Sequence, residues 1–135
     1  MRIILDTSAV VNIVMQTEQA APLMAQLASA GVVFAPEFMR IELANALWKA
    51  AQFANLDAVL VSERFTTGCD LVDQFVGDAA LVQHALSLSL QWKHPVYDML
   101  FIAACQQHGA CLLTRDRKLR VVAEKMGAGL CVPES

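Results

Sequence analysis

Short apolar segments alternate along the chain with longer segments of helical pattern, and this alternation limits the possible folds more than any other feature. Apolar runs bounded by Gly, Pro or polar residues predict five strands, over residues 2–5, 32–35, 71–76, 110–114 and 130–132. The intervening segments predict helices that run from Thr7 to about Met15 and over residues 18–30, 37–53, 56–68, 79–92, 96–108 and 117–126. This order predicts an α/β fold, a three-layer α/β/α sandwich with a mostly parallel five-stranded sheet.

The composition is that of a folded protein rather than of a disordered or membrane-spanning chain. Of 135 residues, 56% are hydrophobic and 17% are charged, and no apolar run is long enough to span a bilayer. Asp6 interrupts the first apolar segment too early for a secretory signal. We therefore expect residues 1–135 to form one domain in the cytoplasm. The four cysteines form no C-x-x-C pair, so we expect reduced thiols.

Two acidic residues follow predicted strands. Asp6 comes directly after strand 2–5, and Asp116 follows strand 110–114. In open parallel sheets, ligands bind at the carboxyl ends of the strands, near the point where strand order reverses. Glu42 and Asp98 lie near the starts of two predicted helices. These four acids are the candidates for a common site.

Each of these acids also has an interpretation without a ligand. Asp6 and Asp116 are suited to capping the helices that follow them. Asp98 is favoured by the positive end of its helix, and Glu42 belongs to a polar stripe that can face solvent. The segment VYDMLFIAAC around Asp98 is nevertheless apolar on nearly all sides, which predicts a buried helix. A lone buried carboxylate is costly without a partner, so this pattern favours a functional role for Asp98.

Convergence of several carboxylates would require either raised pKa values or a cation. Two carboxylates about 5 Å apart repel by roughly 3 kcal/mol at an effective dielectric constant near 20. Oxygen ligands without Cys or His favour Mg²⁺ or Mn²⁺. These ions support the hydrolysis of phosphodiesters by an activated water, without a nucleophilic side chain.

Four motifs resemble those of PIN-domain ribonucleases, and their order and the chain length resemble the VapC-type toxins of bacterial type II toxin–antitoxin pairs. The motifs are LDTSAVV at 5–11, ELANAL at 42–47, YDMLFIAAC at 97–105 and LLTRDRKL at 112–119. The resemblance covers essentially the whole chain. It implies a PIN-like fold and a metal-dependent endoribonuclease that uses Mg²⁺ or Mn²⁺.

The resemblance also implies roles for individual residues. The metal-binding acids of the family match Asp6, Glu42, Asp98 and Asp116, with Asp6 and Asp98 as metal ligands; contact of Asp116 with the metal, direct or through water, is left open. The polar residues that position a carboxylate or a metal-bound water match Thr7, Ser8 and Thr114. Asn12 and Asn45 are further candidates for lining the pocket. A cognate antitoxin and a homodimer are the implied partners, with an antitoxin groove formed by residues 9–30 and 56–66.

A basic cluster surrounds Asp116 in a chain whose formal net charge is -3. We expect Arg115, Arg117 and Lys118 to bind RNA phosphates, although a solvated helix face explains them equally well. The three histidines have no ligand-like spacing. We therefore expect structural or exposed positions for His84, His94 and His108, and core or interface positions for the two tryptophans.

Two other functions remain open from the sequence. The first is a PIN module of weak activity that acts mainly by binding its antitoxin. The second is a phosphohydrolase with Asp6 as nucleophile, similar to the haloacid dehalogenases. Those enzymes use D-x-D after the first strand, whereas Ser8 stands at the second acidic position of this chain.

Overall fold

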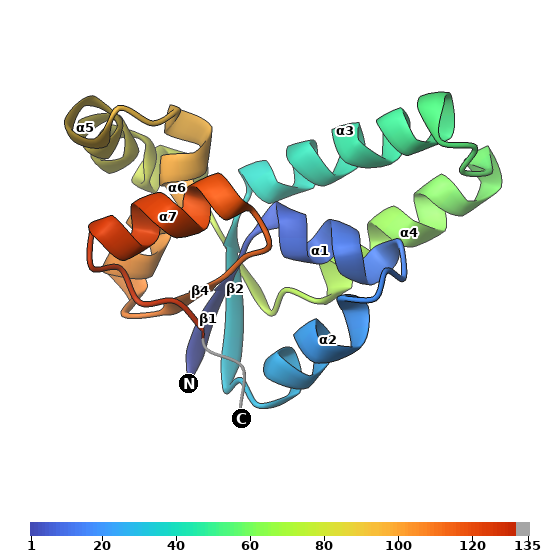
Figure 1. Cartoon of the computed structure of the whole chain (residues 1–135), viewed down its shortest axis with the longest axis horizontal. Helices are drawn as coiled ribbons and strands as arrows, with labels where there is room; N and C mark the ends of the chain where they lie inside the picture. The colour runs from blue at the N-terminus through green and yellow to red at the C-terminus, as the bar shows by residue number, and fades with distance from the viewer. Residues whose placement is uncertain (132–135) are drawn as a thin grey trace.

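A computed structural model describes residues 1–131, and a parallel sheet lies at its centre with helices on both sides (Figure 1). The strands are β1 Arg2–Leu5, β2 Val32–Pro36, β3 Gln74–Val76 and β4 Cys111–Leu113. The α-helices are α1 Thr7–Val14, α2 Ala20–Ala28, α3 Phe38–Phe53, α4 Ala58–Asp70, α5 Val82–Trp92, α6 Val96–His108 and α7 Arg117–Lys125, and a short 3₁₀ helix covers Asp78–Ala80. The predicted α/β class and the alternation of strands and helices are confirmed.

The strands lie in the order β3-β2-β1-β4, and each neighbouring pair is parallel. β1 is central: Ile3 pairs with Val33 of β2, and Ile4 pairs with Leu112 of β4. The chain builds the sheet from β1 outward to β3 and then returns to place β4 on the other side of β1. The strand order therefore reverses between β1 and β4, so their carboxyl ends are the favoured ligand position in such a sheet.

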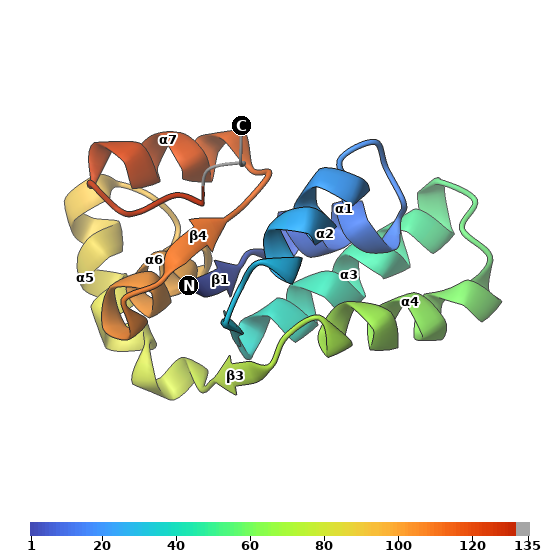
Figure 2. The same cartoon turned by 90° about the horizontal axis from the view of Figure 1, so that it is seen from below.

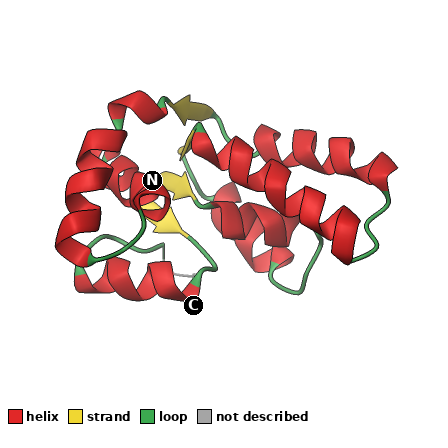
Figure 3. Ribbon diagram, turned by 90° about the horizontal axis from the view of Figure 1, so that it is seen from above, coloured by secondary structure: helices red, strands yellow, loops and turns green. Residues whose placement is uncertain are grey.

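The helices form two groups. Helices α1 to α4 lie to one side of the sheet, and α5 to α7 lie to the other (Figures 1 and 2). α6 packs on β1, β2 and β4, and every residue from Met99 to Cys105 is buried, as the apolar segment predicted. α3 and α4 pack against each other and extend away from the sheet (Figure 3). Within residues 1–131, no helix is both long and apolar enough to cross a membrane.

Within residues 1–131 the sheet has four strands rather than the predicted five. Leu130 forms only an isolated parallel bridge with Leu112, and residue 132 lies outside the described part of the chain. The third strand is also shorter than predicted, because α4 continues to Asp70 and the chain then turns through Leu71 and Val72. Pairing with β2 begins around Asp73, whose backbone N–H donates to the carbonyl of Val33.

Two cysteines form a disulfide, which corrects the prediction that all four are reduced thiols. Cys111 and Cys131 are bonded, with their Cα atoms 5.2 Å apart. The turn after α7 brings Cys131 back beside β4, where its N–H donates to the carbonyl of Leu112. A sequence separation of 20 residues carries no signal for this pairing. Cys69 and Cys105 are free.

Gly68 lies within α4, which continues to Asp70 beyond the predicted helix end at residue 68. A Cβ atom built at this position would lie 2.6 Å from Cδ2 of Leu43 and 2.9 Å from Cγ1 of Val10. Leu43 belongs to α3 and Val10 to α1, and both side chains are fully buried. The glycine therefore allows three helices to approach one another closely.

Substituting this glycine tests the packing of the three helices. We expect Gly68→Ala to lower the free energy of unfolding by about 1–3 kcal/mol, because overpacking of the core outweighs the gain of roughly 1 kcal/mol in helix propensity. Urea unfolding followed by circular dichroism measures the change. Gly77→Ala is the control, since no atom of residues 1–131 lies within 4 Å of its added Cβ. Equal stability of Gly68→Ala and the parent would contradict this account of the packing.

Candidate functional site

The four candidate acids line one pocket at the carboxyl edge of the sheet. Its volume is about 410 Å³, and Asp6, Glu42, Asp98 and Asp116 all contribute to its wall. These residues come from the end of β1, from α3, from α6 and from the start of α7, so the pocket depends on the tertiary fold. The remaining wall is formed by α1 and α3, through Thr7, Ser8, Val11, Asn12, Asn45, Ala46 and Lys49.

Asp6 is the most deeply buried of the four acids, with 5% of its surface exposed. Its Oδ2 accepts hydrogen bonds from Ser8 Oγ and from Thr114 Oγ1, both at 2.6 Å. The backbone N–H of Asp6 donates to the carbonyl of Leu113, which fixes the end of β1 against the end of β4. The side chain makes no capping hydrogen bond to α1, so the capping interpretation of Asp6 was wrong.

Glu42 faces the pocket from α3 and is partly buried. Thr7 Oγ1 donates a hydrogen bond of 2.8 Å to its Oε1. Asn45 and Lys49 lie one and two turns further along α3, and both line the same pocket. The exposed side chains of Asn45 and Lys49 therefore border the pocket on the same face of α3 as Glu42, which is itself partly buried and hydrogen-bonded rather than fully solvated.

Asp98 has a histidine partner that the sequence analysis did not identify. His94 Nε2 lies 2.8 Å from Asp98 Oδ2, and both side chains are partly buried. The two residues are four positions apart, with Pro95 between them at the N-terminus of α6. The spacing of four residues could have indicated this pair from the sequence. The proline obscured that signal, because a helix begins only after that residue. His94 supplies the partner that no Lys or Arg of α6 provides.

Asp116 combines capping with a place in the pocket wall. Its Oδ1 accepts hydrogen bonds from the backbone N–H groups of Lys118 and Leu119, so it caps α7 as one interpretation predicted. The neighbouring cations do not line the acidic pocket. Arg115 is exposed, and Arg117 and Lys118 line an adjacent pocket instead.

Burial and mutual repulsion raise the pKa values of three of the acids. Burial raises the pKa of Asp6; the hydrogen bonds from Ser8 and Thr114 lower it, and the charges of Asp116 and Asp98 raise it further. Burial raises the pKa of Glu42 to about 7, and the other three acids add to the shift against the hydrogen bond from Thr7. Burial also raises the pKa of Asp98, despite the opposing effect of His94. Such shifts indicate a site that favours a bound proton or cation.

The donor set suits a divalent cation that keeps part of its water shell. Carboxylate and hydroxyl oxygens are the donors at the acidic end of the pocket, and they match the preference of Mg²⁺ and Mn²⁺. Within residues 1–131, no three His, Cys, Asp or Glu side chains form a ready-made metal cage. Mg²⁺ is commonly held by one or two carboxylates, with waters and substrate phosphate completing its coordination. The arrangement fits that mode of binding and does not fit a closed structural site.

The family model of the PIN domain matches residues 3–125, which include all four acids and the hydroxyl residues around them. No curated protein sequence matches the chain.

Solved structures share the fold at low sequence identity. PAE2754 from Pyrobaculum aerophilum has a TM-score of 0.72 and 18% identity, over 90% of this chain and 79% of that one. VapBC2 from Rickettsia felis, bound to a DNA fragment from its promoter, has a TM-score of 0.69 and 13% identity, over 97% and 98% of the two chains. A toxin–antitoxin complex from Klebsiella pneumoniae has a TM-score of 0.62 and 16% identity, over 85% and 87%. At these identities the similarity establishes the fold.

The raised pKa of Glu42 leads to a testable pH dependence of stability. The folded chain holds this proton more tightly than the unfolded chain, so ionisation of Glu42 destabilises the fold. The loss develops as the pH rises from 4.5 through about 7. We expect Glu42→Gln to melt at the same temperature as the parent near pH 4 and a few degrees higher at pH 8, because the Gln amide oxygen can still accept from Thr7.

Thermal melts in EDTA across this pH range measure the difference between Glu42→Gln and the parent. Glu63→Gln is the matched control, because Glu63 is exposed on α4. Its difference from the parent should not vary across the same range. A Glu42→Gln difference that stays constant from pH 4 to pH 8 would contradict the raised pKa.

Proposed function

The chain belongs to the PIN domain family, and on this basis we propose that it is a metal-dependent endoribonuclease and the toxin of a toxin–antitoxin pair. The observation that carries the proposal is the meeting of four carboxylates in one pocket at the point where strand order reverses. Three of them have raised pKa values, which supports a role in holding a cation. We further propose that residues 1–135 form one PIN-like domain acting in the cytoplasm.

We propose Asp6 and Asp98 as the metal ligands, with Glu42 and Asp116 completing the acidic site. When bound, Mg²⁺ or Mn²⁺ would polarise the scissile phosphate and activate a water for hydrolysis. The hydroxyl groups of Ser8 and Thr114 orient Asp6, and the hydroxyl of Thr7 orients Glu42. His94 holds Asp98 by the hydrogen bond between Nε2 and Oδ2. Partners of this kind keep metal-binding carboxylates in position and tune their affinity.

The charges around the pocket support an anionic polymer as substrate. Lys49 lies along the groove between α1 and α3, while Arg117 and Lys118 lie beyond Asp116 on α7. Cations therefore flank the acids on both sides. These positively charged side chains can neutralise the phosphates on either side of the scissile bond, while the buried acids hold the metal ion. Arg115 is exposed beside Asp116, and we propose that it adds to this attraction.

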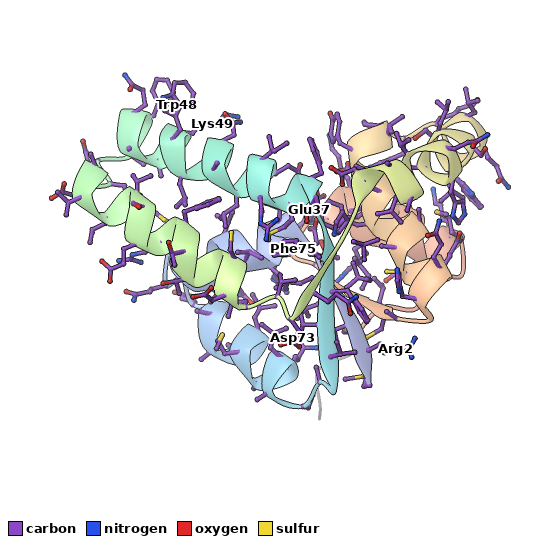
Figure 4. All side chains as sticks on the ribbon, turned by 180° about the vertical axis from the view of Figure 1, so that it is seen from behind. Arg2, Glu37, Trp48, Lys49, Asp73 and Phe75 are labelled. Carbon is purple, nitrogen blue, oxygen red and sulfur yellow. A yellow bond between two sulfur atoms is a disulfide. The ribbon has the colours of Figure 1, made fainter. Side chains whose placement is uncertain are left out.

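Binding of an antitoxin is the second function that a specific observation favours. Phe53 and Val59 are 76% and 79% exposed, and Trp48 is 54% exposed at the outer end of α3 (Figure 4). Beside them, α3 and α4 form an apolar groove of about 300 Å³ that includes Leu47, Val61 and Phe65. This groove shares residues 58–65 with the predicted antitoxin site but uses α3 in place of α1 and α2. We propose it for an apolar antitoxin segment, and leave homodimerisation as a further proposal.

Replacing single acids tests the nuclease. We expect Asp6→Asn or Asp98→Asn to lower the cleavage rate of total cellular RNA at least about a hundredfold in the presence of Mg²⁺ or Mn²⁺, because each change removes a proposed ligand charge. EDTA should abolish cleavage by the parent. Mapping the new ends should reveal 5′-phosphates and 3′-hydroxyls.

Asp70→Asn is the control for the loss of one acidic charge, because Asp70 is exposed at the end of α4. Circular dichroism should show that all three variants are folded. Full activity of Asp6→Asn, or of the parent in EDTA, would refute the proposed mechanism. A phosphoaspartate trapped at Asp6 would favour the phosphohydrolase instead.

Replacing exposed apolar residues tests the antitoxin surface. We expect Phe53→Ser and Val59→Ser to weaken binding of the proposed antitoxin at least tenfold, since exposed apolar side chains gain most when a partner buries them. Isothermal titration with the purified partner measures the affinity. Val82→Ser is the control, because Val82 is 48% exposed on α5, away from the groove. Unchanged affinity of both α3–α4 variants would place the partner elsewhere.

A further inference from the structure

A second pocket lies beside the acidic site, between the end of α5 and α7. Its volume is about 620 Å³, which is ample for a small ligand. Trp92 and Val121 contribute apolar surface, and His94 lies between them and the acids. Arg117, Lys118 and Lys125 line the same pocket from one helix and are all exposed. In two views, one end of α7 lies near α5 and the two helices run at a steep angle to each other (Figures 1 and 2).

The chemistry of this pocket matches one type of ligand. Among residues 1–131, none that lines the pocket is acidic, and three that line it carry a positive charge. A nucleotide combines a flat aromatic base with an anionic phosphate, and proteins bind single strands by stacking the faces of bases on aromatic rings beside cations. Trp92 is half-buried and packed against the core, so its ring is held in place to receive a base.

Two contacts connect the wall of this pocket to the wall of the acidic site. His94 lines this pocket and bonds Asp98 in the other, with 2.8 Å between Nε2 and Oδ2. Asp116 lines the acidic pocket and caps the helix that carries the three cations. The two pockets are therefore neighbours, and a strand bound at the acids can extend toward Trp92.

We propose that this pocket seats one nucleotide of single-stranded RNA next to the cleaved bond, with its base on Trp92 and its phosphates at Arg117, Lys118 and Lys125. The inference rests on the proposed nuclease function, and it adds the position at which the substrate is bound. Single-stranded DNA offers the same base and phosphate, so the two nucleic acids are compared in the experiment below.

Tryptophan fluorescence tests the proposal in the full-length protein. The chain has two tryptophans, and Trp48→Phe leaves Trp92 as the only one. In EDTA, where no cleavage is expected, we expect an oligoribonucleotide of about eight residues to quench Trp92 with saturation. Lys125→Gln should weaken binding and reduce the dependence of log affinity on log salt by about 0.7, the value for one phosphate contact of a single strand. Trp92→Leu, followed by fluorescence anisotropy of labelled RNA, should weaken binding by about fivefold to a hundredfold.

Arg120→Gln is the matched control for Lys125→Gln. It removes one positive charge from α7, but Arg120 does not line the pocket. Because Lys125 is exposed, its variant tests the proposal even if Trp92→Leu fails to fold. Similar quenching by DNA and RNA would support a nucleotide site without selection for the sugar.

Three results would overturn the proposal. The first is binding of RNA, detected by anisotropy, without any change in Trp92 emission. The second is an equal loss of affinity in Arg120→Gln and Lys125→Gln. The third is quenching by the antitoxin but not by RNA, which would assign the pocket to a protein. Cleavage by Asp6→Asn with normal quenching would refute the proposed mechanism alone, whereas metal-dependent cleavage without quenching would refute only the nucleotide pocket.

Discussion

Asp6 is buried where two parallel strands end together, and the rest of the acidic pocket depends on how that carboxylate is accommodated. Leu5 and Leu113 pair in register, so the residues that follow them emerge side by side at the carboxyl edge of the sheet. The side chain of Thr114 therefore reaches Asp6, and Ser8 reaches it from the first turn of α1. A carboxylate this deeply buried is tolerated only with such partners. The switch in strand order is thus also the place where the chain concentrates its polar contacts.

The other three acids lie in the same pocket as Asp6 and do not compensate its negative charge. Burial raises the pKa values of Asp6, Glu42 and Asp98, and repulsion adds to it: Asp116 and Asp98 act on Asp6, the other three acids act on Glu42, and Asp116 acts on Asp98. Hydroxyl groups from Thr7, Ser8 and Thr114 partly offset this repulsion, because a hydroxyl donates to a carboxylate without adding charge. The fold therefore holds the acids in position, and their uncompensated negative charge favours binding of a cation.

The sequence predicted the elements and the edge of the site because both depend on local patterns. The predicted strand ends indicated that Asp6 and Thr114 lie at the carboxyl edge of the sheet. The apolar segment around Asp98 predicted the buried helix α6. Contacts between distant segments carried no such signal. The disulfide of Cys111 and Cys131 depends on a turn that returns the chain to β4, and Gly68 has its role from close packing against Leu43 and Val10. The apolar segment around Leu130 predicted another strand, whereas the structure has an isolated bridge at that residue.

The interpretations of Asp116 as a helix cap and as part of the site are compatible, and this has a consequence for the surrounding charge. Its Oδ1 holds the N-terminus of α7 through Lys118 and Leu119, while the residue also lines the acidic pocket. The helix that carries Arg117 and Lys118 is therefore anchored to the acids themselves. In a chain of net charge -3, attraction of a polyanion depends on cations near the site, because charges further than about 8 Å away are largely screened at physiological salt. The cap of α7 thus sets the distance between the negative and positive parts of the proposed binding surface.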